Sequence, residues 1–187
     1  DGIKRRYVAV QHKISGIKST EEQKEFALML DDISEKTKAT IVFFVAGTAP
    51  NHDSFDIYDE ICSHMTNKDA VVYRGGEHVW KIVALISEAE AVLGSSLHVR
   101  IMSFVFIKPR ITFCTEIKHE EFIKFWEPDD ATACMKTKTG VWSVLQKYMG
   151  KEPEVSMAST KQKYAELVSL YQNHFDKWST LLNREKR

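Results

Sequence analysis

A histidine at the start of an apolar helix pattern is the residue of this sequence best positioned for chemistry. The segment 92–98 reads Val-Leu-Gly-Ser-Ser-Leu-His, a short apolar run followed by a turn of small residues that ends at His98. Its surroundings predict a buried strand over Ala91–Leu93 and a helix over Val99–Phe106. Where the carboxyl end of a strand faces a helix N-terminus, free backbone N–H groups and the helix dipole favour an anionic ligand. A histidine there can donate to a carboxylate or transfer a proton near neutral pH.

Polar and small residues also follow three other predicted strands. They are Lys13 after the first strand, Gly47, Thr48, His52 and Asp53 after the second, and Arg74 and Glu77 after the third. The carboxyl ends of parallel strands meet at one edge of a sheet, so we expect these side chains near His98. Lys13 could neutralise a phosphate, and Gly47 and Thr48 could let a phosphate approach the backbone. The remaining four side chains could face a sugar or a nucleotide. Glu116, after a fifth strand, is a weaker candidate base.

Each candidate also has a purely structural interpretation. Ser95 and Ser96 could bind phosphate oxygens, but they can equally cap the helix that follows them, as Asp53 can cap a helix beginning near residue 54. Glu77 lies in the first turn of a predicted helix, where an acid is favourable without any ligand. The histidine itself could be a capping residue, the lysine a solvated loop residue, and Arg100 is expected only to extend its charge to the surface. The sequence leaves these alternatives open.

The elements that must position these residues alternate along the chain. Strands are expected over 7–11, 40–46, 70–73, 91–93 and 110–114, and helix patterns begin near residues 20, 54, 77 and 99. This alternation predicts βαβ crossovers, and therefore a Rossmann-like α/β fold with a mainly parallel sheet and flanking helices. After residue 126 no strand pattern is found, and helices are expected near 139–149 and 159–183. We divide the chain into an α/β domain, 1–127, and a helical C-terminal extension, 128–187, that covers this domain or a missing partner lobe.

Composition excludes several classes of function. The 26 basic and 26 acidic residues balance, so no basic footprint for nucleic acid is present. The longest apolar run, near 101–107, is too short for a transmembrane segment. Three widely spaced cysteines form no C-x-x-C pair, which favours reduced thiols in a cytoplasmic protein and no metal site. The motifs of dinucleotide-binding, P-loop, zinc-protease and serine-hydrolase proteins are absent.

With these residues assigned, the chain resembles the C-terminal half of the polysaccharide pyruvyltransferase family, over about residues 5–126. The family's segment reads roughly "v-i-g-t/s-R-L-H", then an apolar helix and "P-v/i", as in residues 92–98 and in Lys108–Ile111 here. Its first strand resembles the run from Val8 to Lys13, and its histidine–aspartate pair resembles residues 52–53. The family's two arginines fall on Lys13 and Ser96, and lysine offers a point charge without the bidentate fork.

The resemblance implies one lobe of a two-lobed, GT-B-type transferase. Phosphoenolpyruvate would be the donor substrate, no other cofactor would be needed, and the acceptor would be a sugar hydroxyl of a glycan. His98 would contact the donor carboxylate or protonate its methylene, Ser95, Ser96 and Lys13 would hold the phosphate, and the residues at 52–53 would face the acceptor. An N-terminal lobe would be missing from this chain, which is then expected to be inactive alone. The alternatives are a nucleotide-sugar-binding lobe of a GT-B-like glycosyltransferase and a non-catalytic glycan-binding or scaffold module.

Overall fold

One parallel sheet forms the centre of the molecule. The structure, a computed structural model, describes residues 6–47, 52–75, 78–113, 116–127, 134–149 and 157–184. Its strands follow the order β3-β2-β1-β4-β5-β6, and every pairing between them is parallel. They are β1 (Tyr7–Gln11), β2 (Thr40–Phe44), β3 (Val71–Tyr73), β4 (Ala91–Gly94), β5 (Arg110–Phe113) and β6 (Cys134–Met135). The Rossmann-like α/β fold predicted from the alternation of strands and helices is confirmed.

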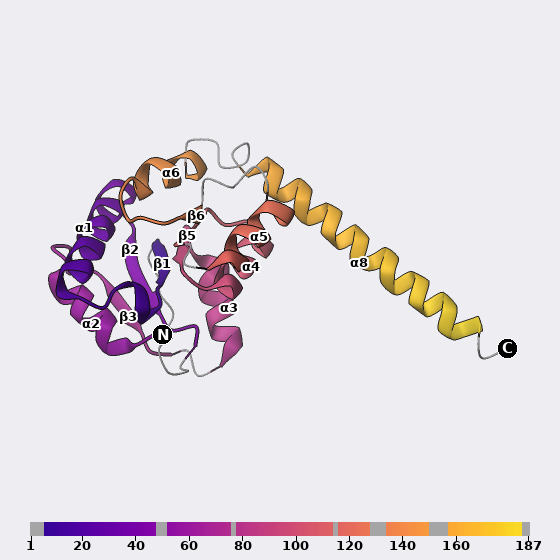
Figure 1. The fold of residues 1–187 in the computed structure, drawn as a ribbon, viewed down its shortest axis with the longest axis horizontal. Helices are drawn as coiled ribbons and strands as arrows, with labels where there is room; N and C mark the ends of the chain where they lie inside the picture. The colour runs from indigo at the N-terminus through magenta and orange to yellow at the C-terminus, as the bar shows by residue number, and fades with distance from the viewer. Residues whose placement is uncertain are drawn as a thin grey trace.

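Helices cover both faces of this sheet. Figure 1 shows α1 and α2 on one side, α3, α4 and α5 on the other, and α6 beside α1. The helices are α1 (Thr20–Thr37), α2 (Phe55–His64), α3 (Val79–Glu88), α4 (Leu97–Val105), α5 (Ile117–Trp126), α6 (Val141–Tyr148) and α8 (Ala158–Arg184), with a short 3-10 helix, η1 (Ile14–Gly16), after β1. This two-sided cover explains the apolar runs of the strands, since a parallel sheet between two helix layers exposes neither face.

Alternate residues of the central strand supply two separate cores. Val8 and Val10 pack into the cluster beneath α1, α2 and α6, whereas Ala9 packs into the cluster beneath α3 and α4. All five residues of β1 are buried. The first helix begins where its sequence predicts, because Ser19 Oγ accepts from Glu22 N at 3.2 Å and the Glu22 carboxylate accepts from Ser19 N at 2.9 Å. This reciprocal cap satisfies N–H groups that would otherwise lack partners.

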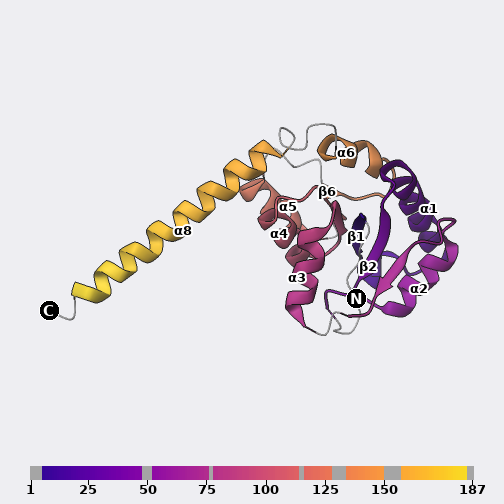
Figure 2. The ribbon, with the colours of Figure 1, turned by 180° about the vertical axis from the view of Figure 1, so that it is seen from behind.

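The expectation that no strand follows residue 126 is wrong. Strand β6 extends the sheet, with Phe113 opposite Met135, although its two residues are too few to form a recognisable pattern. Helix α6 then contributes Val141 and Leu145 to the larger core, so segment 134–149 is part of the α/β layers. Of the helices and strands that the structure describes, α8 alone projects away from the body, as the views from both sides show (Figures 1 and 2).

The cysteines also differ from expectation. Among the cysteines that the structure describes, Cys62 is a free thiol and Cys134 is disulfide-bonded. The prediction of reduced thiols is therefore wrong for Cys134. Disulfides persist mainly in oxidising compartments, so a cytoplasmic location stays a prediction. Across the described helices, none combines the length and the apolar character needed to cross a membrane.

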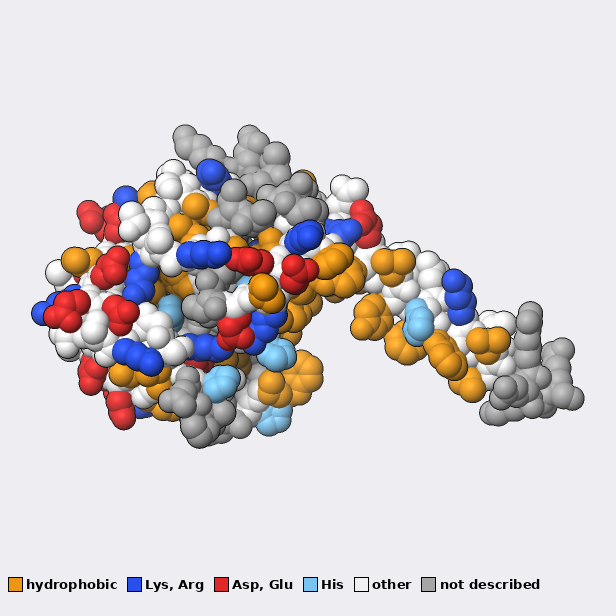
Figure 3. Space-filling model, viewed as in Figure 1, with side chains coloured by type: hydrophobic (Ala, Val, Ile, Leu, Met, Phe, Trp, Pro, Cys, Tyr) orange, Lys and Arg blue, Asp and Glu red, His pale blue; other side chains and the backbone are white. Residues whose placement is uncertain are grey.

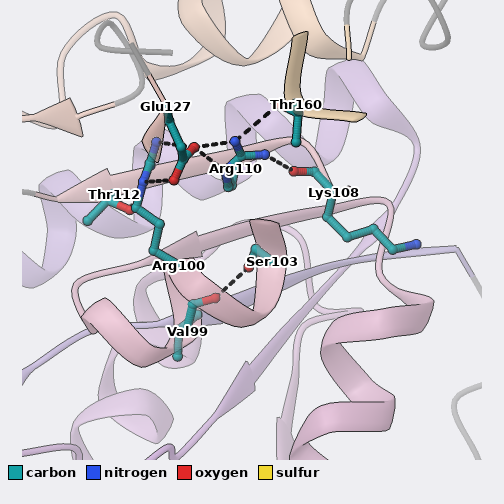
Figure 4. A network of polar contacts seen from close by, with 8 residues as sticks. All are labelled: Val99, Arg100, Ser103, Lys108, Arg110, Thr112, Glu127 and Thr160. Carbon is teal, nitrogen blue, oxygen red and sulfur yellow. Dashed lines mark hydrogen bonds and ion pairs between the residues drawn. The ribbon is translucent and has the colours of Figure 1, made fainter. Parts of the chain in front are cut away.

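A buried ionic network fastens α5 and α8 to the sheet (Figure 4). Arg100 from α4 donates to both carboxylate oxygens of Glu127, at 3.0 and 2.9 Å, and to Thr112 Oγ1 at 3.0 Å. Arg110 from β5 donates to the same carboxylate and, at 3.3 Å, to the hydroxyl of Thr160 in the first turn of α8. The expectation that Arg100 extends to the surface is wrong, because a guanidinium with a fully buried carboxylate partner needs no solvent.

Candidate functional site

A pocket of about 580 Å³ lies at the carboxyl ends of the central strands. The strand order reverses between β1 and β4, and ligands of open α/β sheets bind at such a switch point. One wall is apolar and comes from α3 and α4: Val79, Ile82, Val83, Ile86, Leu97, Val99, Ile101 and Met102. The other is largely polar: Gln11, Lys13, Gly47, His52, Asp53, Ser96, His98 and Lys118, with Ala46. Five strand and helix connections thus converge on one cavity.

The side chain of Gln11 holds the turn before α4. Its Oε1 accepts hydrogen bonds from Ser95 N at 3.1 Å and from Ser96 N at 3.0 Å. Ser96 is the N-cap of α4, but its own side chain makes no capping bond. The amide of Gln11 therefore occupies the two N–H groups to which the sequence assigned a phosphate. A bound anion must use other donors, such as the first-turn N–H groups of α4, which have no partner within a helix.

The same Gln11 joins this turn to the loop after β2. Its Nε2 donates to Asp53 Oδ1 at 2.6 Å, and Ala46 N donates to Asp53 Oδ2 at 2.8 Å. Burial raises the pKa of Asp53, and the bonds from Ala46 and Gln11 oppose that rise. The N-cap of α2 is Ser54, so the capping alternative for Asp53 does not describe its contacts. Asp53 instead holds the loop after β2 in place, and it also lines the pocket.

Ser95 is buried next to the pocket and contacts the backbone of one of its lining residues. It is fully buried, and its Oγ accepts from Lys13 N at 2.8 Å. It is not among the pocket-lining residues, so its described role is to hold the backbone of Lys13. The ammonium of Lys13 contacts Glu116, whose second oxygen lies 2.7 Å from Lys118 Nζ. Two lysines of the pocket thus share one carboxylate, and those lysines hold the pKa of Glu116 at about 2.

Two histidines and a glycine complete the lining. His98 lies in the first turn of α4 with its ring exposed, and within the described part of the chain its side chain has no hydrogen-bond partner. His52 is also exposed and lines the same pocket, and its carbonyl accepts from Ile14 N at 2.9 Å. Gly47 borders the loop, and its carbonyl accepts from Asp53 N at 3.3 Å. The three are brought together as the strand-end argument predicts.

One predicted residue that the structure describes, Arg74, is not brought to this pocket. Arg74 turns toward α2, where it pairs with Asp59 and lies 5.0 Å above the ring of Phe55. It does not line the cavity, because that ion pair draws it away from the switch point. Thr48 and Glu77 lie outside the described residues, so their predicted roles stay predictions.

The structure adds residues that the sequence did not single out. Gln11 ends an apolar strand, which is the signal that could have found it, whereas Lys118 lies on the unexpected helix α5. His12 packs between Phe26 and Phe113, with ring centroids 5.1 Å from each, and its Nδ1 donates to the Lys13 carbonyl at 2.8 Å. Burial lowers the pKa of His12 to about 4. This neutral imidazole supports Lys13 from the core side.

Comparison with known proteins supports the fold. No family model and no curated protein matches the sequence. A UDP-GlcNAc 2-epimerase from Methanocaldococcus jannaschii matches with a TM-score of 0.58 and 15% identity, over 79% of this chain and 40% of the epimerase. A Neisseria meningitidis UDP-GlcNAc 2-epimerase solved with UDP-GlcNAc matches with a TM-score of 0.53 and 13% identity, over 92% and 45%. The S. aureus protein MnaA, solved with UDP, matches with a TM-score of 0.59 and 10% identity, over 92% and 47%.

These similarities establish a GT-B-like lobe and nothing finer. The chain spans less than half the length of each of the three proteins. All three matches lie well below the identity at which function can be transferred. Resemblance to the pyruvyltransferase family therefore stays a prediction, and a second lobe remains an expectation.

Proposed function

We propose that this domain is the donor-binding lobe of a two-lobed glycan-modifying transferase that uses phosphoenolpyruvate. The observation that carries the proposal is the convergence of His98, Lys13 and Lys118 on one pocket at the switch point. Two ammonium groups suit a phosphate, and a histidine free of side-chain partners in the described structure suits the donor's carboxylate or methylene. The order of the residues along the chain resembles the pyruvyltransferase pattern, which supports the choice of donor.

The reaction adds an acceptor hydroxyl across the enol double bond. His98 would give a proton to the methylene carbon while the hydroxyl oxygen bonds to the neighbouring carbon that carries the phosphate. The proton of the hydroxyl replaces the one that His98 gave up, the C–O bond to phosphate breaks, and inorganic phosphate leaves between the two lysines. A second hydroxyl of the same sugar then closes the ketal, and its proton goes to the departing phosphate. His52 and Asp53, which line the same pocket, would orient the acceptor.

The acceptor glycan and a second lobe are the proposed partners. The cavity is open, and this chain spans less than half the length of each of the three similar proteins. Along α8 the hydrophobic side chains gather on one side (Figure 3), with Tyr171 and Phe175 more than 60% exposed. A second lobe over this surface would close the site, so we expect residues 1–187 to bind the donor without turning it over.

A nucleotide-sugar-binding lobe is the second candidate. Two of the similar structures contain UDP-GlcNAc or UDP, and the apolar side chains of α3 and α4 offer a surface on which a base could pack. The same lysines would then hold a diphosphate. A glycan-binding module without catalysis is a third candidate, and it requires neither ligand.

Titration by NMR separates these candidates. Phosphoenolpyruvate, UDP and GDP are added separately to the wild-type chain, His98→Ala and His174→Ala. His174 lies on exposed α8, away from the pocket, and is the matched control. Pyruvyl transfer predicts that phosphoenolpyruvate binds and that only His98→Ala weakens it, by about tenfold for a lost charge-assisted hydrogen bond.

The other outcomes are equally informative. UDP binding that survives His98→Ala favours the nucleotide-sugar lobe. Binding of neither phosphoenolpyruvate nor a nucleotide, with the fold intact, contradicts both enzymatic candidates for this domain.

A further inference from the structure

A glutamate sits between the two lysines of the pocket. Glu116 Oε1 contacts Lys13 Nζ, and Oε2 lies 2.7 Å from Lys118 Nζ. Both lysines line the pocket, whereas the glutamate does not. The side chain of Lys13 is 18% exposed and that of Glu116 is 40% exposed, so the carboxylate contacts both solvent and the lysines. One carboxylate therefore already offsets part of the positive charge of the two lysines.

The position of Glu116 shows that its carboxylate serves the lysines and not its own helix. Glu116 is the N-cap of α5, a position where side-chain oxygens usually accept from the first free N–H groups. Its side chain makes no such bond. Its backbone carbonyl accepts from His119 N at 3.1 Å, which fixes the main chain while the side chain reaches across to β1. Both oxygens are thereby available to the two ammonium groups.

We propose that Glu116 is an internal substitute for the anionic group of the ligand. Without ligand it holds Lys13 and Lys118 in position, and a phosphate with its several oxygens displaces it and takes over both lysines. This inference rests on the proposed function only in requiring that the pocket binds a phosphate-bearing ligand, whether phosphoenolpyruvate or a nucleotide diphosphate. A dianionic phosphate competes better than a monocarboxylate, because it can accept from both ammonium groups and carries the larger charge.

Exposure makes the displacement feasible. An ion pair between partly exposed side chains contributes little to stability, since solvent screens it and two long side chains must be ordered. A carboxylate buried with its cations could not be replaced by a ligand from solution, but this one can turn into solvent. The exchange of one anion for another therefore carries no large desolvation cost.

The test is a titration with inorganic phosphate and with phosphoenolpyruvate and UDP, on the wild-type chain, Glu116→Gln and Glu120→Gln. Glu120 lies on the same helix, where it pairs with Lys136 at 2.8 Å, and it does not line the pocket, so it controls for the loss of one negative charge. We expect Glu116→Gln to bind inorganic phosphate about fivefold more tightly than wild type. Glu120→Gln should leave the affinity unchanged, and Glu116→Gln combined with Lys118→Met should lose the gain.

Equal or weaker phosphate binding by Glu116→Gln would overturn the inference, because the glutamate would then orient the lysines and not compete for them. Folding of each variant is checked by its NMR spectrum. Failure of the proposed function is distinguishable. If phosphate binding tightens in Glu116→Gln but phosphoenolpyruvate binding does not depend on His98, then pyruvyl transfer is contradicted and the competing role of Glu116 is retained. Absence of phosphate binding from every variant contradicts both.

Discussion

Helix α5 carries a glutamate at each end, and the two meet their cations in opposite surroundings. Glu116, the N-cap, lies between Lys13 and Lys118 at the rim of a pocket, with 40% of its side chain exposed. Glu127, the C-cap, lies between Arg100 and Arg110 with its side chain fully buried. Among the residues that the structure describes, each cluster contains one carboxylate and two cations. Their difference in burial decides what each can do.

The choice of cation follows the same division. A buried carboxylate must have its oxygens satisfied by directed donors, which the planar guanidinium supplies in a fork. A rim carboxylate can be served by ammonium groups, which act as mobile point charges and remain hydrated. The buried cluster is therefore suited to hold elements together permanently, and the rim cluster is suited to exchange partners.

Neutralising the buried glutamate should have the largest effect. Glu127→Gln keeps the shape of the side chain but leaves Arg100 and Arg110 without their shared counter-charge. Breaking a buried ion pair by removing one partner costs about 3–5 kcal/mol. We expect a loss of that size in the free energy of unfolding, measured by urea denaturation followed by circular dichroism.

The matched control is Glu116→Gln, the same change at the other end of α5. Because its ion pairs are partly exposed, the free energy of unfolding should change by less than about 1 kcal/mol. Similar losses in the two variants would show that burial does not separate the clusters and would remove the basis of the comparison.

A buried histidine behind the rim cluster gives the next effect, one that depends on pH. His12 binds a proton near pH 6.5 in the unfolded chain but only near pH 4 when folded, because burial lowers its pKa. The stability that its neutral form allows is present above pH 6.5 and is lost as the pH falls toward 4. By linkage, the wild-type chain should lose about 2 kcal/mol more between pH 7 and pH 5 than His12→Gln, whose side chain does not titrate.

Denaturation at the two pH values measures this difference. Other titrating groups, including the buried His119, are present in both proteins and cancel in the comparison. Parallel losses in wild type and His12→Gln would mean that the imidazole of His12 is solvated in the folded chain.

The residues also show which parts of the fold can be predicted from sequence. Long apolar runs such as that beginning at Thr40 correctly predicted strands, because a parallel strand between two helix layers is apolar on both faces. Strand β6 has two residues and helix α5 begins with mostly polar ones, so neither produced a pattern. The missed segment contains both the rim lysine Lys118 and the C-cap Glu127. The sequence analysis therefore missed one member of each cluster because it did not predict α5.

Of the candidate site, the sequence could predict only which residues lie together at the carboxyl ends of the strands. Lys13, Asp53 and His98 share a pocket because parallel strands bring their carboxyl ends to one edge. The pairing of Lys13 with Glu116, 103 residues away, depends on how side chains meet across elements, and no local pattern encodes that. Arg100 was misjudged for the same reason, since its carboxylate partner is 27 residues further along.

Substitution of two adjacent serines should give the smallest changes in the free energy of unfolding. The pair compares a buried with a partly exposed group at the level of single hydroxyls. Ser95 is fully buried and accepts from Lys13 N at 2.8 Å, whereas Ser96 is half-buried and makes no side-chain capping bond. Ser95→Ala leaves a partly buried N–H without its acceptor and should cost about 1–2 kcal/mol in the free energy of unfolding. Ser96→Ala, usually costly at an N-cap, should cost less than about 0.5 kcal/mol, because Gln11 already accepts from the backbone of this turn. A larger loss in Ser96→Ala than in Ser95→Ala, measured by urea denaturation, would show that Ser96 caps α4 after all and that the amide of Gln11 does not hold this turn.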